Sequence, residues 1–449
     1  MARVAVVGGG LLGMSLAGRL ADQGHQVVVF EAASRSGGLA EPAAIGEYTW
    51  DRFYHVILQS DRHLLGMIQQ LGLSEELRWH ATRTGFYIDR RLLSLSSTLE
   101  FLTFPALGPV DKARLAMTIL YAARIRAWRR LETILARDWL IRWSGRRTWL
   151  RMWQPLLRAK LGEAAERASA AFIWAIIARM YGARHSGMKR ETFGYVDGGY
   201  ATILARLERS LADRGVTVRF NARVAAVERQ GDHIRVQLTD GTCQADAVVL
   251  TVPCARAAEL CPQLTSPEQE RLRAVEYQGI ICATLLLERP LADYYITNIA
   301  DATIPFTAVI EMTALVPRDR FGGHALVYLP KYVTQSDGWW AKTDEQVLTA
   351  FLAGLERMYP RFERSQVRAC RVNRVRDMLA VSTLEYSSRL LPATTTSIEQ
   401  VFLVNSAQIA NGTLNVNETI GLATRKAEEL RSLICQDRPA DAVRTAGAA

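Results

Sequence analysis

The sequence predicts an α/β protein of two lobes, one with a nucleotide-binding sheet and one with a mixed sheet and helices. Three observations lead to this fold class. The 449 residues exceed the roughly 250 to 300 at which a single hydrophobic core stops growing. The amino terminus has the order strand, glycine turn, helix, strand, and strand-like runs alternate with helical spacing farther along the chain. A hydrophobic content of 49% with 22% charged residues is typical of a globular protein.

Composition argues against several classes of protein. No apolar run reaches the roughly 18 to 20 residues that span a bilayer. Residues 1–10 already form an apolar strand entering a turn, so we expect no secretory signal. The six cysteines are scattered without a CxxC pair, which predicts free thiols, a cytoplasmic location and no metal site.

Residues 3–32 predict a Rossmann-like nucleotide-binding unit. Apolar runs at 4–7 and 27–30 are expected strands, and the stretch between them has helical spacing. Gly8, Gly10 and Gly13 form the pattern G-x-G-x-x-G after the first strand. Gly8 permits the tight turn, Gly10 lets the backbone approach a pyrophosphate, and Gly13 allows the helix to pack closely on the strand.

Two further features complete this unit. The helix begins at Leu11 and Leu12, and its amino terminus faces the negative charge of the pyrophosphate. Glu31 ends the second strand, where a carboxylate accepts hydrogen bonds from ribose hydroxyls. Together the strands, helix and acid favour a dinucleotide site over a glycine-rich turn without function.

The run RSGGL follows at residues 35–39. With Glu31 it resembles the E-x-x-x-R-x-G-G element of the FAD-binding amine oxidase superfamily, which includes protoporphyrinogen oxidases, phytoene desaturases and monoamine oxidases. The resemblance implies that Gly37 and Gly38 pass close to the FAD phosphates and ribityl chain, with Arg35 and Leu39 beside them. It therefore implies FAD rather than NAD as the cofactor.

Residues 193–253 carry the resemblance through the middle of the chain. They predict a glycine turn, an amphipathic helix and three or four short strands. The resemblance implies that one of these strands places the backbone of Val224 against the adenine.

The carboxyl-terminal run from 401 to 421 is the third match. The resemblance implies that a strand ends at Asn405 and Ser406 beside the ribityl chain, where relatives have an acid. A helix is expected from Asn415, and either Asn415 or Asn417 is expected to cap it. The resemblance implies that the backbone amide of Val416 or Asn417 faces the flavin. No cysteine lies between 371 and 434, so we expect FAD to bind without covalent attachment.

These matches imply a discontinuous FAD-binding domain of the GR2 type, interrupted by a substrate-binding domain with a mixed sheet and helices. The expected FAD-binding segments are 1–75, 192–275 and 395–435. The expected substrate-binding segments are 76–191 and 276–394, and residues 436–449 are expected to be a flexible tail.

Candidate catalytic residues follow the double glycine. Asp51 is in register with the superfamily's Asp-x-Gly, but Phe53 stands where a glycine is usual, followed by Tyr54 and His55. His55 is a candidate acid or base, and the competing interpretation is a packed residue of the cavity wall. A similar H-x-I element in UDP-galactopyranose mutases keeps that chemistry open as an alternative.

The superfamily's amine oxidases often use a lysine and two aromatic residues near the flavin. Spacing selects none of the lysines or tyrosines, and our prediction takes Lys331 with Tyr54 and His55 as the catalytic candidates. The other candidates are Lys160, Lys189, Tyr328, Tyr332 and Tyr386.

Residues 111–190 form a basic, tryptophan-rich segment. They hold 18 Lys or Arg against five Asp or Glu, and six of the ten tryptophans. Helical spacing predicts that Leu115, Ile119, Leu120 and Ala123 share one apolar face. An anionic membrane surface or lipid-phosphate substrate and an ordinary helical lobe are the leading interpretations, followed by an anionic soluble substrate; nucleic acid is the least favoured.

We therefore predict an FAD-dependent oxidoreductase that transfers a hydride from a C–H bond of a hydrophobic or amine substrate to the flavin, resembling protoporphyrinogen oxidases and desaturases. The alternatives are a UDP-galactopyranose mutase-like enzyme acting on a nucleotide sugar and a flavin-binding scaffold without turnover. We expect a cytoplasmic location, with peripheral membrane association as an open alternative.

Overall fold

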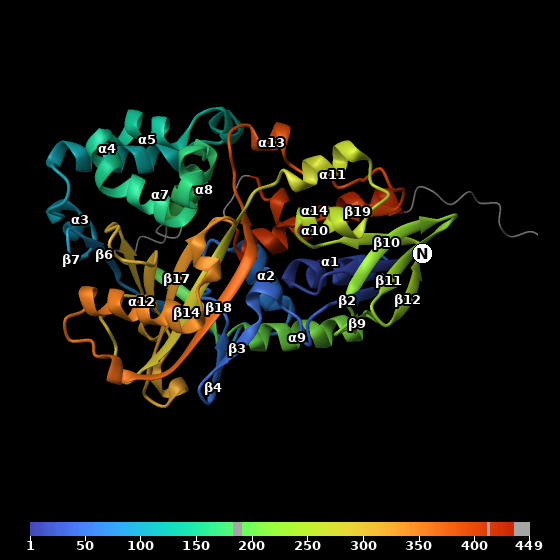
Figure 1. Cartoon of the computed structure of the whole chain (residues 1–449), viewed down its shortest axis with the longest axis horizontal. Coiled ribbons are helices and arrows are strands. Elements are labelled where there is room, and N and C mark those ends of the chain that lie inside the picture. Colours follow the sequence, from blue (N-terminus) through green and yellow to red (C-terminus); the bar gives the residue numbers. More distant parts are fainter. Residues whose placement is uncertain (183–190, 411–413, 435–449) are drawn as a thin grey trace, which may run out of the picture.

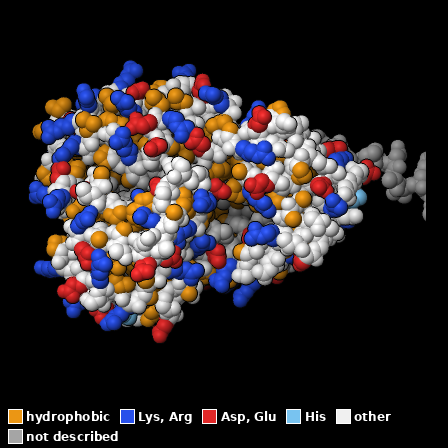
Figure 2. All heavy atoms as spheres, viewed as in Figure 1, with side chains coloured by type: hydrophobic (Ala, Val, Ile, Leu, Met, Phe, Trp, Pro, Cys, Tyr) orange, Lys and Arg blue, Asp and Glu red, His pale blue; other side chains and the backbone are white. Residues whose placement is uncertain are grey.

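The computed structural model describes residues 1–182, 191–410 and 414–434. Within them, a parallel sheet lies toward one end of the long axis, and a mixed sheet and a group of helices lie toward the other (Figure 1). The space-filling view is hollowed where these two halves meet (Figure 2). The expected tail at 436–449 and Lys189 lie outside the described residues.

The parallel sheet has five strands from three distant parts of the chain. In order across the sheet they are β19 (Val401–Leu403), β13 (Ala247–Leu250), β1 (Arg3–Val7), β2 (Gln26–Phe30) and β9 (Thr217–Arg219). Every side chain of β13 is buried, as expected for a parallel strand covered on both faces. The predicted strands at 4–7 and 27–30 are confirmed as neighbours in this sheet.

Helices cover one face of the parallel sheet, and a small antiparallel sheet with two further helices covers the other. The first face carries α1 (Leu11–Asp22), α2 (Arg62–Gln70), α9 (Tyr200–Asp213) and α14 (Val416–Ile434). The second carries β10 (Val224–Gln230), β11 (His233–Leu238), β12 (Gly241–Ala245), α10 (Cys254–Leu260) and α11 (Ser266–Arg273). The predicted helix after the glycine turn and the predicted short strands after 216 are confirmed.

The mixed sheet has seven strands and belongs to the other half of the molecule. In order they are β18 (Val367–Ala380), β14 (Tyr277–Leu287), β17 (Ala325–Val333), β16 (Ala308–Glu311), β15 (Ile296–Ile299), β6 (Thr84–Ile88) and β7 (Arg91–Ser94). Successive side chains of β17 point to opposite faces, so Tyr328 faces one core cluster and Leu329 another. The helix α12 (Asp344–Met358) packs on the second of these faces.

Two ribbons connect the halves. They are β3 (Pro42–Ile45) with β4 (Tyr48–Asp51), and β5 (Leu77–Ala81) with β8 (Thr192–Val196). In the second ribbon, β8 returns the chain to the parallel-sheet half after a group of helices that lies between β5 and β8 in the sequence.

Those helices form a separate lobe above the mixed sheet in Figure 1. They are α3 (Thr98–Thr103), α4 (Pro109–Ala122), α5 (Ala136–Ser144), α6 (Arg146–Thr148), α7 (Gln154–Leu161) and α8 (Ala170–Gly182). Trp139 and Trp149 are buried in its core. Leu115 is buried, whereas Leu120, which was expected on the same apolar face, is 42% exposed.

Candidate functional site

A cavity of about 600 Å³ is lined by residues from both halves of the molecule. The parallel-sheet half contributes the loops after β1 and β2 and the first turn of α14. The other half contributes residues of β14, β17 and β18 and two helices of the helical lobe, α7 and α8. The predicted nucleotide site and the predicted catalytic region therefore open into the same space.

The glycine turn after β1 packs tightly against the second glycine pair. Gly8 has a φ of +116°, which only glycine adopts readily. The amide of Gly37 donates a hydrogen bond to the carbonyl of Gly9 at 2.9 Å, and Gly10 and Gly37 form a parallel bridge. A Cβ atom on Gly13 would lie 2.0 Å from the Gly8 carbonyl oxygen, so α1 can pack here only with glycine at this position.

The same turn leaves its backbone open to the cavity. A Cβ atom placed on Gly10 would have Gly38 Cα, at 4.0 Å, as its nearest neighbour. Gly10 caps α1 without a side-chain hydrogen bond, and Leu11 and Leu12 of the first turn line the cavity with it. Free backbone donors at a helix amino terminus favour an anion, so this cradle fits a diphosphate.

Glu31 lines the cavity and is held by two backbone amides. Its carboxylate accepts from the amide of Gly9 at 2.6 Å and from the amide of Ala33 at 2.8 Å. Each carboxylate oxygen has a second lone pair, so this geometry is compatible with the predicted bond to a ribose.

Not every predicted cofactor residue lines the cavity. Gly37, Gly38 and Leu39 do, whereas the guanidinium of Arg35 is largely exposed and lies 3.8 Å from the carboxylate of Glu41. The Val224 side chain is buried between the parallel sheet and the elements β10 to β12, α10 and α11, away from the cavity lining.

The two residues predicted at the end of β19 have different roles. Asn405 is 1% exposed; its carbonyl oxygen accepts from the amide of Ala407 at 3.1 Å, and its Nδ2 donates to the carbonyl of Val252 at 2.9 Å. These bonds hold the loop in place, and only Ser406 of the pair lines the cavity.

The first turn of α14 also separates its predicted residues. The Asn415 side chain accepts from the amide of Glu418 at 3.0 Å, so Asn415 caps the helix as predicted, and it lines the cavity with Val416. Asn417 turns away from the cavity lining, and its Oδ1 accepts from the amide of His63 at 2.9 Å in the first turn of α2. This bond ties the amino termini of two helices together.

Two tyrosines and a lysine form a polar group on the other wall of the cavity. The hydroxyl oxygens of Tyr54 and Tyr332 lie 2.7 Å apart, and Lys160 Nζ lies 5.5 Å from the ring centre of Tyr332. Burial raises the pKa of Tyr54 well above its ordinary value, so that hydroxyl stays protonated.

The catalytic assignment of Lys331 is corrected by the structure. Because Lys331 and Tyr332 are consecutive on β17, their side chains point to opposite faces of the sheet. Lys331 Nζ lies over the ring of Trp339 at 4.7 Å, outside the cavity lining, and burial lowers its pKa. Two other tyrosine candidates are also occupied elsewhere, since Tyr328 and Tyr386 are buried and donate to the carbonyls of Asp51 and Ala407.

Asp51 and His55 form a buried titratable pair. Asp51 Oδ1 accepts from the amide of Tyr200 at 2.8 Å, and Asp51 Oδ2 lies 4.0 Å from His55 Nδ1. Burial raises the pKa of Asp51 to about 7 and lowers the pKa of His55 to about 4. His55 lines the cavity, and its Nδ1 is buried without a hydrogen-bond partner, so it can accept a proton or a hydrogen bond there.

Two arginines that line the cavity are already paired with carboxylates. Arg52 Nη1 lies 3.4 Å from Glu41 Oε2, and Arg179 Nη2 lies 3.1 Å from Asp61 Oδ2. Sequence reasoning did not single out Arg179 as a site residue. The signal that could have found it is a lone charge within the apolar run AAFIWAIIARM of α8.

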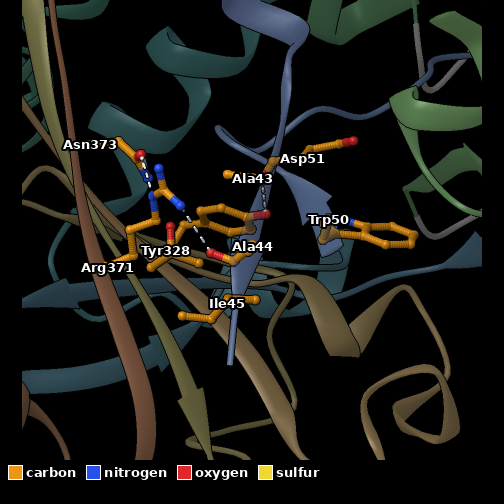
Figure 3. Close-up of a pocket in the computed structure, with 9 residues that line it drawn as sticks. Ala43, Ala44, Ile45, Trp50, Asp51, Tyr328, Arg371 and Asn373 are labelled. Carbon is orange, nitrogen blue, oxygen red and sulfur yellow. Dashed lines mark hydrogen bonds between the residues drawn. The ribbon is translucent and has the colours of Figure 1, made fainter. Parts of the chain in front are cut away.

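A second, very small pocket of about 10 Å³ lies behind Asp51 (Figure 3). Arg371 reaches from β18 and donates to the carbonyl of Ala44 at 3.4 Å and to Asn373 Oδ1 at 3.2 Å. This space suits about one water molecule and no substrate. Its hydrogen bonds instead hold β3 and β4 against the mixed sheet and so fix the backbone of Asp51.

Neither a metal-binding cluster nor a membrane-spanning helix is found in the described residues. No group of three or more His, Cys, Asp or Glu in residues 1–182, 191–410 and 414–434 is arranged to hold a metal ion. Among the helices of the same residues, none is long and apolar enough to cross a bilayer.

The sequence matches a known family over most of its length. The profile of the flavin containing amine oxidoreductases matches residues 13–430. Protoporphyrinogen oxidase from Nicotiana tabacum is 32% identical over 88 residues, which are 20% of this chain and 18% of that protein. The chain therefore matches less than a fifth of that relative's length.

Solved structures share the fold at low sequence identity. A provisionally named protoporphyrinogen oxidase from Exiguobacterium sp. 255-15 has a TM-score of 0.75 and 18% identity over 96% of this chain and 98% of its own. A reduced UDP-galactopyranose mutase has a TM-score of 0.73 and 12% identity over 97% and 96% of the two chains. At such identities the likeness concerns the fold alone.

Proposed function

Because the chain belongs to the flavin containing amine oxidoreductase family and is an FAD-dependent oxidoreductase, we propose that it oxidises an apolar small molecule carrying an anionic group. The single observation that supports this substrate class is Lys160 in the cavity wall, beside the hydroxyl pair of Tyr54 and Tyr332. The remainder of that wall is largely apolar, with Ile280 and Met378 among its residues.

The charges of the cavity support an anionic rather than a cationic substrate. Arg52 and Arg179 are neutralised by Glu41 and Asp61, whereas Lys160 has no carboxylate within 4 Å among the described residues. Asp377 of β18 also lines the cavity, and burial raises its pKa, which favours its neutral form. A protonated amine brought to this wall would be repelled by Lys160, and a carboxylate would be attracted. This favours a porphyrinogen-like or other carboxylated apolar substrate over a simple amine.

The glycine cradle and the first turn of α14 are the proposed holders of FAD, bound without a covalent link, in a domain of residues 1–75, 192–275 and 395–435. When bound, FAD accepts the hydride that the substrate loses. The residues proposed to hold it are Gly8, Gly10, Leu11, Leu12, Glu31, Gly37, Gly38, Leu39, Ser406, Asn415 and Val416.

Loss of a hydride leaves the substrate one proton in excess, and His55 is the proposed acceptor. A proton taken up by His55 can pass from Nδ1, which has no other hydrogen-bond partner, to the Asp51 carboxylate 4.0 Å away, because burial raises the pKa of Asp51 to about 7. The neutral hydroxyl of Tyr54 can donate a hydrogen bond that orients the substrate. Molecular oxygen or a quinone would take up the two electrons at the end of the cycle.

Anaerobic mixing of the FAD-loaded protein with candidate substrates tests the proposal. Carboxylated tetrapyrroles and fatty or isoprenoid acids should bleach the oxidised flavin absorbance, and polyamines should not. Lys160→Met should raise the KM for the anionic substrate about tenfold, as expected for loss of one charge-assisted contact. Lys331→Met is the matched control and should leave KM unchanged; bleaching by amines alone would contradict the proposed substrate class.

A mutase acting on a nucleotide sugar is the second candidate, because the fold and the H-x-I element at His55 are shared with that class. A diphosphate clamp would need free arginines, and Arg52 and Arg179 are paired. Turnover of a nucleotide sugar only after prior reduction of the flavin would favour the mutase.

A further inference from the structure

Large exposed hydrophobic side chains gather on the helical lobe. Apart from Met1, all such side chains in the described residues lie between 99 and 150. They are Leu99, Leu102, Val110, Met117, Leu120, Tyr121, Ile134 and Leu150. A soluble surface normally scatters such residues over the whole molecule, so their confinement to one lobe indicates an interaction surface.

The helix α4 has exposed apolar residues that are separate from the face it buries in the core. Leu115, Thr118 and Ala122 form its buried face at spacings of three and four. Val110, Met117 and Tyr121, at spacings of seven and four, lie on the opposite side and are exposed, Val110 by 72% and Met117 by 64%. The helix is therefore apolar on two faces, and on the second face Tyr121 stacks on Trp143 with 4.2 Å between ring centres, while Val110 and Met117 remain exposed.

Positive charge surrounds the exposed face. Residues 98–153 contain eleven Lys or Arg and four Asp or Glu. Three of the four acids are engaged: Glu100 in the cap of α3, Glu132 buried against Ser387, and Asp111 near Arg147. Figure 2 shows basic and hydrophobic side chains interspersed over this lobe.

Several arginines of this lobe lack an ion pair within 4 Å among the described residues. Arg124 and Arg126 follow α4 directly and are exposed. The others are Arg129, Arg130, Arg137, Arg142 and Arg146. Because these charges are not balanced locally, the complementary partner is anionic.

We propose that the exposed face of α4, with Leu99 and Leu102 of α3, docks on the surface of an anionic lipid bilayer. The charge complementarity selects this partner: apolar side chains enter the interface while arginines beside them meet anionic headgroups. The lobe would lie on the bilayer without crossing it, and it is the lobe that supplies Lys160 and Arg179 to the cavity.

Sedimentation of the FAD-loaded protein with lipid vesicles tests the proposal. The protein should sediment with vesicles of phosphatidylcholine mixed with phosphatidylserine, and much less with phosphatidylcholine alone. Arg124→Gln with Arg126→Gln should weaken binding about fivefold per charge removed, and added salt should reduce the difference from the wild type. Val110→Gln with Met117→Gln should weaken binding about tenfold or more through the loss of apolar area.

The matched control is Arg271→Gln with Arg273→Gln on α11 of the other half, which removes the same charge and should leave vesicle binding unchanged. Flavin absorbance and thermal unfolding verify that each variant is folded. Equal loss of binding in the control, or no binding to mixed vesicles, would overturn the proposal. Binding to single-stranded RNA without vesicle binding, or a dimer in sedimentation velocity that Met117→Gln dissociates, would assign the face to those partners instead.

Discussion

Replacing Asp51 by asparagine should increase the stability of the protein at neutral pH. Asp51 is 5% exposed, and its carboxylate accepts one amide hydrogen bond, from Tyr200 at 2.8 Å. An asparagine has the same shape, and its carbonyl oxygen can accept the same bond. Its amide can donate to His55 Nδ1, which is buried without a partner.

The magnitude follows from the pKa of Asp51, which burial raises from 3.8 to about 7. A group with a raised pKa in the folded state stabilises fully below its unfolded pKa and loses that contribution as pH rises through the folded value. Ionised Asp51 should therefore cost roughly 4 kcal/mol above pH 7, at 1.36 kcal/mol per pKa unit. The gain in the free energy of unfolding from Asp51→Asn should be near zero below pH 4, on the order of 1 to 2 kcal/mol at pH 5 and on the order of 4 kcal/mol at pH 8.

Urea unfolding at pH 5 and pH 8, with the slope m compared between proteins, measures this gain. Asp61→Asn is the matched control, because Asp61 is equally buried but paired with Arg179. The Asp61→Asn substitution should lower the free energy of unfolding by about 2 kcal/mol. An equal loss of stability in the Asp51→Asn and Asp61→Asn variants would refute the reasoning, because it would show that the Asp51 charge stabilises the protein. Because His55 is the proposed proton acceptor, the stabilised Asp51→Asn protein should also have a lower kcat.

Three further outcomes are expected. Gly13→Ala should abolish FAD uptake on titration, because its Cβ would lie 2.0 Å from the Gly8 carbonyl oxygen; uptake at wild-type affinity would contradict this packing. Lys331→Met should leave the flavin absorbance and kcat unchanged while lowering the melting temperature slightly, since Lys331 packs on Trp339; a large loss of kcat would restore the original assignment. Asn417→Ala should destabilise the protein by about 1 kcal/mol in chemical denaturation by uncapping α2, with Asn417→Asp as the control that keeps the acceptor.

Local patterns in the sequence predicted the glycine cradle well. The strands at 4–7 and 27–30 and the helix between them were set by apolar spacing and by glycines whose roles depend on neighbours only a few residues away. Asn415 was predicted as a cap for the same reason, since capping is decided within one turn of helix.

The catalytic wall was harder to predict because it is assembled from distant segments. Alternation along β17 places Tyr332 and Lys331 on opposite faces of the sheet, but which of the two faces meets the cavity depends on how the strand is placed in the sheet. Lys160 and Arg179 come from helices whose packing angles the sequence pattern does not specify. Helical spacing grouped Leu120 with Leu115, but α4 has two apolar faces, and spacing alone does not say which one is buried.

The order of strands in the parallel sheet has a consequence for biosynthesis. Paired residues of the neighbouring strands β1 and β13 are 243 positions apart in the sequence, since Val7 pairs with Leu250, and β19 joins the sheet only at Val401. Contacts of such long range form slowly, and during translation they must wait for the later strand to leave the ribosome.

The last contributor to the cavity is the first turn of α14, at Val416. A nascent chain therefore exposes its amino-terminal strands and glycine turn for nearly the whole period of synthesis before the cavity can close. Cofactor loading should be a late, post-translational event, and the unpaired edges of β1 and β2 make the nascent chain a candidate client for chaperones until then.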